Sequence, residues 1–273
     1  MSEPLGLVVC GAAGRMGRLV VALARDDGRV RVAGAIEAPG HAAIGRDAGE
    51  LAGGSPLGVP VGDRLGAVCA REHVVLDFTA PEATLAHVRV AAERGAGLVV
   101  GTTGLDPEQQ RELREHAGRT RAVVAPNMSV GVTVLAELVA AAARLLDPGF
   151  EAEILELHHH AKKDAPSGTA LALGRAVAAA RGQDFDRTAV LARRGLVGAR
   201  PPGEIGLVAL RAGDAVGDHT VVFGGLGERL ELTHRAQSRE CLARGALRAA
   251  LWVAGQPPGI YSMRDVLGLG RSA

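Results

Sequence analysis

Short apolar runs alternate with amphipathic segments of helical length through the first 128 residues of the chain. The strand-like runs occupy residues 5–10, 29–37, 73–78, 97–101 and 121–127. Helical patterns lie between them, at residues 15–27, 79–95 and 106–118. Strands that alternate with helices usually pair in parallel, because each helix returns the chain along the sheet. This half of the chain is therefore predicted to form an α/β doubly wound parallel sheet.

Two of these helices carry recognisable start signals. Thr79 and Glu82 have the spacing of a capping box, and Pro81 falls in the first turn. Asp106 followed by Pro107 opens the next helix. We expect both helices to begin at these points.

The alternation stops near residue 128. A helix is predicted over residues 130–146, a strand over 150–158 and a second helix over 168–182, and residues 188–235 contain strand-like runs and turns. Such an order is typical of a smaller α+β domain with a mixed or antiparallel sheet. We expect a first domain over residues 1–128, completed by a C-terminal helix over 240–273, and a second domain over 129–239.

The composition argues against several classes of protein. The chain is 47% apolar and 22% charged, which is typical of a globular protein. A formal net charge of +1 and an aromatic content of 2% argue against nucleic-acid binding. The sequence has no apparent signal peptide and no uncharged apolar run of about 18 residues, so neither secretion nor a spanning helix is expected. Three widely separated cysteines suit a reducing cytoplasm.

Gly11, Gly14 and Gly17 lie between the first predicted strand and helix. A tight turn alone could need these glycines, but they would also let the backbone approach a pyrophosphate at the start of a helix. Glu37 ends the next strand, where an acidic side chain can bind the adenosine ribose. The combination predicts a nicotinamide dinucleotide site. Glu37 would repel a 2′-phosphate and Arg15 could offset this, so the choice between NADH and NADPH stays open.

Two later loops, at residues 99–104 and 123–129, follow strands of the same predicted sheet. Ligands of such sheets bind beyond the carboxyl ends of the strands. Ordinary turn chemistry would explain either loop by itself. Together with the glycine loop, they are expected to line the nicotinamide pocket.

Residues 156–171, ELHHHAKKDAPSGTAL, concentrate histidine, lysine and hydroxyl side chains. A polar loop could explain any single residue, and the histidines could be considered as metal ligands. However, His158, His159 and His160 follow a strand, where successive side chains point to opposite sides, so a shared metal is a minority interpretation. No metal is expected here.

Ser167, Gly168 and Thr169 lie at the start of the next predicted helix. Exposed N–H groups there, with the serine and threonine hydroxyls, are expected to form a receptor for a carboxylate. The neighbouring lysines and histidines add positive charge and a proton donor. The stretch therefore fits a small acidic substrate that receives a hydride from the dinucleotide and a proton from the protein.

At this point the chain resembles the dihydrodipicolinate reductases (4-hydroxy-tetrahydrodipicolinate reductases) of bacterial and plant lysine and diaminopimelate synthesis. The resemblance spans almost the whole chain and rests on GAAGRMGR, DFTAPEATL, VVGTTG, APNMSVGV, ELHHHAKKDAPSGTALALG, RAGDAVGDHTVVFGGLGERLELTHRA and MRDVL. It implies a Rossmann-like first domain, reduction of a cyclic imine dicarboxylate by NADH or NADPH, and a homotetramer joined through the sheets of the substrate domains.

The resemblance also implies roles for individual residues. It assigns His158 and Lys162 to catalysis and His159, Gly168 and Thr169 to substrate binding. The implied cofactor-binding residues are Gly11, Ala12, Ala13, Gly14, Arg15, Met16, Glu37, Gly101, Thr102, Thr103, Ala125, Pro126, Asn127 and Met128.

Some members of the family carry an arginine just after the acidic residue. Ala38 occupies that position here, so a strong preference for NADPH is not expected.

Two other functions were considered. A semialdehyde dehydrogenase of similar plan would need a nucleophilic cysteine in the second domain. Cys10 abuts the glycine loop, Cys69 lies in the first domain and Cys241 starts the returning helix, so none of them fits. A non-catalytic dinucleotide sensor would explain the glycine loop but would leave the histidine–lysine stretch without a role.

Overall fold

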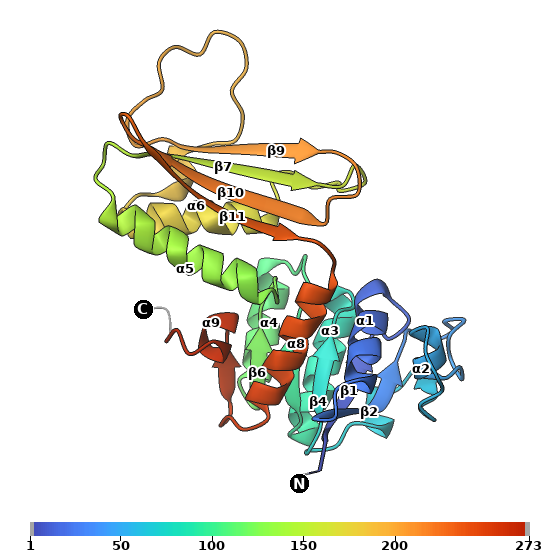
Figure 1. Ribbon diagram of the computed structural model, residues 1–273. Helices are drawn as coiled ribbons and strands as arrows, with labels where there is room; N and C mark the ends of the chain where they lie inside the picture. The colour runs from blue at the N-terminus through green and yellow to red at the C-terminus, as the bar shows by residue number, and fades with distance from the viewer. Residues whose placement is uncertain (1–2, 271–273) are drawn as a thin grey trace. The chain divides into compact units, whose positions relative to one another are not determined.

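The structure, a computed structural model, describes residues 3–270 (Figure 1). It divides into two compact units. The chain up to Val130 and the chain from Glu240 onward form the first unit, and Gly131–Arg239 form the second. The second unit is therefore an insertion in the chain of the first.

The first unit contains a parallel sheet of seven strands within the described residues. Its order is β12-β6-β5-β4-β1-β2-β3. The strands are β1 (Leu5–Cys10), β2 (Val30–Ile36), β3 (Val61–Gly62), β4 (Val74–Asp77), β5 (Gly97–Val100), β6 (Arg121–Val124) and β12 (Gly259–Tyr261). The helices are α1 (Arg15–Arg25), α2 (Ala48–Leu51), the 3₁₀ helix η1 (Leu65–Ala67), α3 (Pro81–Arg94), α4 (Pro107–Ala117), α8 (Glu240–Val253) and α9 (Met263–Val266).

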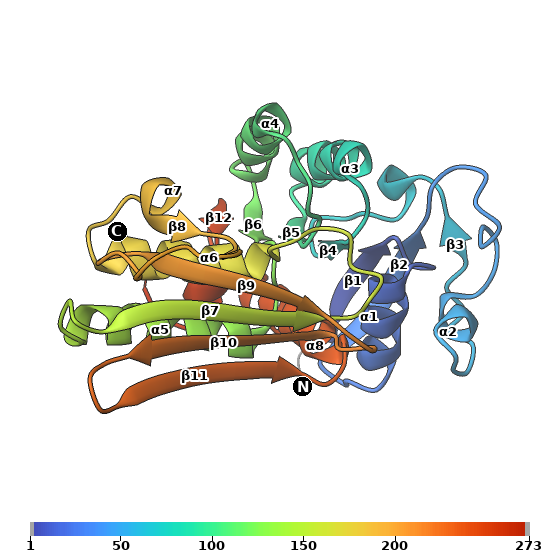
Figure 2. The same cartoon turned by 90° about the horizontal axis from the view of Figure 1, so that it is seen from above.

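Helices bury both faces of this sheet. Leu7 and Val9 of β1 belong to a core shared with α1 and α8, whereas Val8 and Cys10 belong to a core shared with α3 and α4. Figure 2 shows α3 and α4 on one side of the strands and α1 on the other. Successive strand residues point to opposite faces, so a strand covered on both sides is a continuous apolar run. The prediction of a doubly wound parallel sheet is confirmed.

Close contact between α1 and the preceding loop depends on Gly17. A Cβ atom at this position would lie 2.1 Å from the carbonyl oxygen of Gly11. Gly11 itself has a φ of 74°, in the left-handed region that favours glycine. These two glycines let the chain turn from β1 into α1 within four residues.

The prediction for the start of α3 is right for Pro81 but wrong for the capping box. The N-cap residue is Ala80, Pro81 occupies the first turn, and no side chain caps the helix. The hydroxyl of Thr79 instead donates to the carboxylate of Asp77, at 2.7 Å. A buried carboxylate needs hydrogen-bond donors more strongly than a helix end needs a cap, because the helix end can be solvated. By contrast, Asp106 and Pro107 open α4 as expected, and Asp106 also forms a capping box with Gln109.

The expectation of one C-terminal helix over 240–273 is also incorrect. Helix α8 ends at Val253, and the chain then adds β12 to the edge of the sheet beside β6. Pro257 and Pro258 separate the two elements, and proline cannot donate the hydrogen bond that a continuing helix requires. Helix α9 follows, opened by a capping box between Ser262 and Asp265.

The second unit contains a mixed sheet of five strands in the described part of the chain, in the order β11-β10-β7-β9-β8. β7 and β8 run parallel to β9, while β10 runs antiparallel to β7 and to β11. This confirms the expected mixed sheet. The strands are β7 (Glu151–His158), β8 (Ala189–Val190), β9 (Ile205–Arg211), β10 (Gly217–Gly224) and β11 (Arg229–Ala236). The helices are α5 (Val130–Leu145), α6 (Gly168–Ala180) and α7 (Phe185–Thr188).

Within the described residues, helices cover one face of this second sheet. Ile154 and Phe223 are fully buried in a core shared with α5 and α6. On the opposite face, Leu155, Val208 and Leu210 are exposed. Figure 2 views the sheet from this uncovered face, with α5 and α6 behind it.

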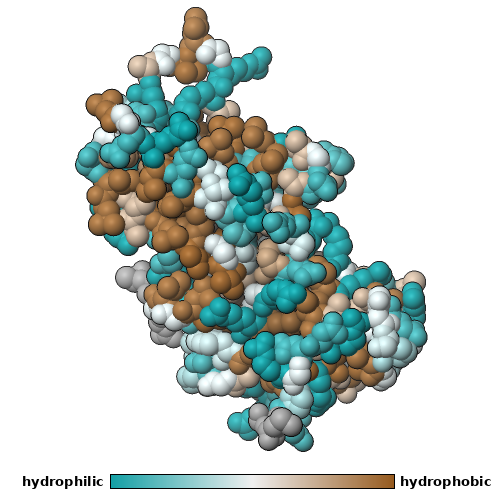
Figure 3. Space-filling model, in the orientation of Figure 1, coloured by the Kyte–Doolittle hydropathy of each residue, from teal (hydrophilic) through white to brown (hydrophobic). Residues whose placement is uncertain are grey.

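Apolar side chains also reach the surface in the loop between β8 and β9. Leu196 and Val197 are exposed there, and Figure 3 shows apolar atoms at the tip of this loop. Within residues 3–270, no helix has both the length and the apolar character needed to cross a membrane.

We predict that Gly17→Ala lowers the free energy of unfolding by about 1–3 kcal/mol, the usual cost of inserting an atom into a packed region. Gly28→Ala is the matched control, because nothing lies within 4 Å of its Cβ position. The control should change stability by less than about 0.5 kcal/mol. Thermal unfolding of the three proteins measures the difference, and equal stability of both variants would contradict the close contact.

Candidate active site

The glycine loop leads directly into the start of α1. Gly14 is the N-cap, and its N–H donates to the carbonyl of Gly11 at 3.0 Å. No side chain caps this helix, and its first turn contains no acidic residue. The carboxylate of Glu37 contacts the N–H of Ala13 just before the helix, but no acidic side chain lies in the first turn itself. The partial positive charge of that turn suits a pyrophosphate.

Glu37 supports this loop from the end of β2. One of its carboxylate oxygens accepts a hydrogen bond from the N–H of Ala13 at 2.7 Å. The same side chain lines a cavity of about 440 Å³ together with Gly11, Ala38 and Thr79. The cavity lies beside the β1–β4 pair, where the strand order reverses, the usual place for a dinucleotide in such sheets.

A second cavity, of about 310 Å³, lies beyond the carboxyl ends of β5 and β6. Thr102, Thr103, Ala125 and Pro126 contribute to its lining. Gly101 is required nearby, because a Cβ atom there would lie 2.1 Å from the ring of Phe78. The residues after β5 and β6 thus lie at the same edge of the sheet as the glycine loop.

The other residues assigned to the cofactor differ in accessibility. Gly14 and Arg15 are exposed, Met16 and Asn127 are half-buried, and the side chains of Ala12 and Met128 are buried. Met128 is only 1% exposed and packs in the core that includes α8, so only its main chain could contact a cofactor. The side chain of Ala125 is buried as well, and the remaining residues assigned to the cofactor are half-buried or exposed.

Asp77 is a buried residue of this edge that the sequence patterns did not indicate. One carboxylate oxygen accepts hydrogen bonds from the hydroxyls of Thr79, Thr84 and Thr102, at 2.7–3.0 Å. The other contacts Nδ1 of His87 at 2.6 Å. Burial opposes ionisation of Asp77, but the bonds to His87 and the threonines outweigh it and lower the pKa. The carboxylate therefore ties the end of β4 to the loop after β5.

Cys10, Asp77 and His87 also form a group of possible metal ligands among the described residues, with ligand atoms within 4.8 Å of one another. Both carboxylate oxygens of Asp77 already have hydrogen-bond partners, the hydroxyl of Thr79 and the imidazole of His87. Burial raises the pKa of the Cys10 thiol well above its usual value, which disfavours the thiolate that would bind a metal or act as a nucleophile. The group is better explained as part of the hydrogen-bonded core.

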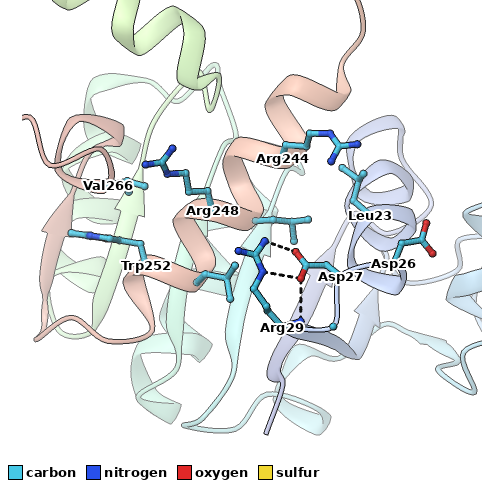
Figure 4. A pocket seen from close by; sticks show the side chains of 11 residues that line it. Leu23, Asp26, Asp27, Arg29, Arg244, Arg248, Trp252 and Val266 are labelled. Carbon is cyan, nitrogen blue, oxygen red and sulfur yellow. Dashed lines mark hydrogen bonds and ion pairs between the residues drawn. The ribbon is translucent and has the colours of Figure 1, made fainter. Parts of the chain in front are cut away.

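A larger groove of about 880 Å³ lies elsewhere in the first unit (Figure 4). It is lined by the residues that follow α1 and by Arg244, Arg248 and Trp252 of α8. Figure 4 also shows the ion pair between Arg29 and Asp27 in its wall. Helix α1 runs from the glycine loop to this groove, so the groove lies away from the carboxyl edge of the sheet where the cofactor residues gather.

The second unit gathers its polar side chains around Glu156. This residue is 1% exposed, and its carboxylate contacts Nδ1 of His158 at 2.5 Å and the N–H of Ser167 at 3.0 Å. The guanidinium of Arg211 donates to both carboxylate oxygens at 2.9 Å. Burial raises the pKa of Glu156, but Arg211 and His158 lower it more, so the carboxylate is ionised.

Ser167 has a different role from the one expected. It is the N-cap of α6, and its hydroxyl accepts from the N–H of Ala170 and contacts Nε2 of His219 at 3.0 Å. Ser167 is buried, so its hydroxyl does not form the expected carboxylate receptor. Gly168 is exposed, with nothing within 4 Å of its Cβ position, and Thr169 is half-buried. The exposed start of α6 is thus at Gly168.

Two other predicted residues, His159 and Lys162, lie in the segment after β7. The N–H of His159 donates to the carbonyl of Ala215, and partial desolvation, followed by the charge of Arg239, lowers the pKa of His159. Lys162 donates to both oxygens of Asp164 at 2.9 Å. Lys162 is therefore held in an ion pair beside the start of α6.

The three consecutive histidines do not share a ligand position. Nδ1 of His158 contacts Glu156, whereas Nδ1 of His160 contacts the carbonyl of Gly213 at 3.0 Å. These different partners argue against the minority interpretation of a histidine metal site. They favour separate roles for the histidines.

Comparison with known proteins decides the family. The family model described as "Dihydrodipicolinate reductase, N-terminus" matches residues 5–128, and the corresponding C-terminus model matches residues 131–267. The chain belongs to the dihydrodipicolinate reductase family. The expected family resemblance is therefore confirmed, and the chain is an NAD(P)H-dependent oxidoreductase.

Members of the family match over nearly their whole length. The 4-hydroxy-tetrahydrodipicolinate reductase of Anaeromyxobacter dehalogenans is 52% identical over 96% of this chain and 97% of its own length. That of Syntrophobacter fumaroxidans is 50% identical over 96% of this chain and 98% of its own length.

A solved structure supports the same fold. It is described as a dipicolinate-bound dihydrodipicolinate reductase from a Paenisporosarcina species, with a TM-score of 0.74 and 21% identity over 96% of this chain and 98% of that chain.

Glu37→Gln offers a test of the dinucleotide site. The amide oxygen still accepts from Ala13, but the negative charge that repels a 2′-phosphate is lost. We predict that the ratio of the NADPH to the NADH dissociation constant falls about tenfold, measured by quenching of nicotinamide fluorescence. An unchanged ratio would remove Glu37 from the ribose contact.

Proposed function

We propose that the chain reduces the cyclic imine dicarboxylate derived from 4-hydroxy-tetrahydrodipicolinate to tetrahydrodipicolinate, in lysine and diaminopimelate synthesis. The first unit binds NADH or NADPH, and the second binds the substrate. His158 donates the proton, Lys162 supplies positive charge, and His159, Gly168 and Thr169 bind the substrate.

One observation carries this proposal. The carboxylate of Glu156 contacts His158 through one oxygen and the start of α6 through the N–H of Ser167. The proposed proton donor, His158, and the positively charged start of α6 therefore both contact the buried carboxylate of Glu156. Such a combination suits a substrate that brings carboxylates and accepts a proton.

The bound nicotinamide supplies a hydride to C4 of the conjugated imine. Main-chain N–H groups at Gly168 and Thr169 orient a substrate carboxylate, and each such charge-assisted bond contributes about 1.5–3 kcal/mol. His158 transfers a proton to the ring as negative charge develops there. General-acid help of this kind is typically worth about 10²–10⁴-fold in rate.

Lys162 can exchange its partner when the substrate arrives. Its present partner, Asp164, is 66% exposed, and an ion pair with so exposed a partner is worth little. A substrate carboxylate beside the start of α6 can therefore replace Asp164. The cation then offsets the charge that develops on the ring.

The proposal also includes a homotetramer. The uncovered face of the second sheet carries Leu155, Val208 and Leu210, all exposed. Contiguous apolar surface of this kind is typical of an interface. Copies of the chain would cover it through their own second units.

A cytoplasmic location completes the proposal. None of the cysteines forms a disulfide in the described part of the chain, and Cys10 and Cys69 are buried. This supports a reducing compartment.

Two substitutions should separate proton transfer from substrate binding. His158→Gln is predicted to lower kcat by about 10²-fold or more with the Michaelis constant within a few-fold, because it removes a transition-state interaction. Thr169→Ala keeps the main-chain N–H but removes the side-chain hydroxyl, a further donor to the substrate carboxylate. It should mainly raise the Michaelis constant for the imine, by about five- to tenfold, the equivalent of one hydrogen bond.

Steady-state rates with freshly generated imine measure both effects, and NADH affinity should stay unchanged in both variants. Parental kcat in His158→Gln would move the proton-transfer role elsewhere, with Lys162 the first candidate. Dipicolinate, a planar dicarboxylate, should compete with the imine in the parent protein.

The tetramer can be tested by sedimentation. The parent is predicted to sediment at four times the chain mass of 28.0 kDa. Leu155→Glu with Leu210→Glu should give smaller species, because both place a charge on the uncovered face. Arg111→Glu, on exposed α4, serves as a control and should keep the parental mass. A parent that sediments as a monomer would exclude the tetramer.

A further inference from the structure

The ring of His158 is held on three sides. Nδ1 contacts the carboxylate of Glu156 at 2.5 Å, and the ring of His219 meets it edge-on, with centroids 5.2 Å apart. On the third side, a Cβ atom at Gly217 would lie 2.9 Å from Nε2 of His158. Only a glycine at this position leaves room for the imidazole where it lies.

Strand pairing sets these contacts. Glu156 and His158 are two residues apart on β7, so their side chains share one face of the sheet. His219 of β10 is the register partner of Glu156, and Arg211 of β9 is the register partner of His158. Backbone hydrogen bonds on both sides of β7 thus fix the four side chains, with no flexible loop between them.

Arg211 keeps the carboxylate in place and ionised. Besides its two bonds to Glu156, its guanidinium donates to the carbonyl of Asp164 at 2.7 Å. It therefore links β7, β9 and the segment that leads into α6. A planar guanidinium that binds both carboxylate oxygens fixes their orientation as well as their charge.

We infer that Glu156 is a positioning residue for the reaction: its buried carboxylate holds the hydrogen of His158 on Nδ1 and so makes Nε2 the atom that carries and transfers the proton. Glu156 acts through His158 and needs no contact with substrate. The inference rests on the proposed role of His158 as the proton donor.

The proton balance follows from this arrangement. In the charged imidazolium, Nδ1–H donates to Glu156 and Nε2–H points away from it. The Nε2–H bond breaks as the substrate ring takes the proton, and a neutral imidazole remains with its hydrogen on Nδ1. The hydride from the nicotinamide and this proton together complete the reduction, and solvent later restores the proton on Nε2.

The ring of His158 lies among several charged or titratable groups. The charged or titratable groups around its ring are Glu156, Arg211, His219, His159 and Lys162. Burial, followed by repulsion from His158, lowers the pKa of His219 to about 4, so His219 is neutral near pH 7. The ionised carboxylate of Glu156 is the only anion in direct contact with the ring among the described residues.

The test compares four variants of the full chain: Glu156→Gln, His158→Gln, the double variant and Glu153→Gln. The last is a matched control, because Glu153 lies on the same strand and also binds two arginines, Arg193 and Arg200. It belongs to the opposite face of the sheet. Glu153→Gln is expected to keep the parental kcat and pH profile.

Glu156→Gln should lower kcat about tenfold or more and leave the NADH affinity unchanged. It should also shift the pH profile. An anion beside a proton donor favours the protonated form of that donor. Its loss should therefore move the falling limb of the kcat profile to lower pH.

The double variant separates positioning from a merely structural role. If Glu156 acts only through His158, the double variant should be no slower than His158→Gln alone, within about twofold. A further large loss in the double variant would overturn the inference. Parental kcat and pH profile in Glu156→Gln would also overturn it, whereas parental kcat in His158→Gln would instead contradict the proposed function.

A measurement on the unmodified protein covers the case in which Glu156→Gln does not fold. Histidine ring nitrogens can be observed by NMR in the cofactor-free chain, with the His158 signals assigned from the His158→Gln spectrum. Neutral His158 should carry its hydrogen on Nδ1. A neutral ring with its hydrogen on Nε2 would overturn the inference without any assay of activity.

Discussion

A carboxylate removed from water must be surrounded by donors or cations, and this requirement organises both units of the molecule. Asp77 is fully buried in the first unit and Glu156 is 1% exposed in the second. Each lies near the carboxyl end of a strand, β4 for Asp77 and β7 for Glu156, beside the residues assigned to the candidate site. Each also binds a histidine and the main chain or a hydroxyl of a neighbouring segment. In each unit, the hydrogen bonds that an ionised buried carboxylate requires therefore hold neighbouring segments of the candidate site together.

The parts of the fold that were predictable from the sequence are those with a local cause. Apolar runs alternating with helical periodicity were sufficient for the parallel sheet, because both faces of its strands are buried. The glycine loop was predictable because few residues other than glycine fit at two of its positions. Gly11 has a positive φ, and Gly17 lies against the carbonyl oxygen of Gly11. Short elements such as β3 and β12 have too few residues to show a period.

The parts that could not be predicted depend on partners distant in the sequence. Thr79 has the spacing of a cap, but Asp77 and Thr102 determine where its hydroxyl and N–H bind. Ser167 was expected to face a ligand, yet its hydroxyl forms a hydrogen bond with His219, 52 residues later in the sequence. The i, i+2 spacing of Glu156 and His158 on a predicted strand was a visible signal. Arg211 was not foreseeable, because only the pairing of β7 with β9 brings it there.

The first unit can complete its fold only late in synthesis, because its parts are separated in the sequence by the second unit. Its core face beside α1 is completed by Ala246, Ala250 and Val253 of α8, and the edge of β6 is paired only by β12. These residues are made only after the whole inserted unit. Until they are made, the growing chain exposes an apolar sheet face and an unpaired strand edge, a state in which nascent chains are prone to aggregate. During this time the native contacts do not yet exist. Only factors that bind the nascent chain can then keep these surfaces from aggregating.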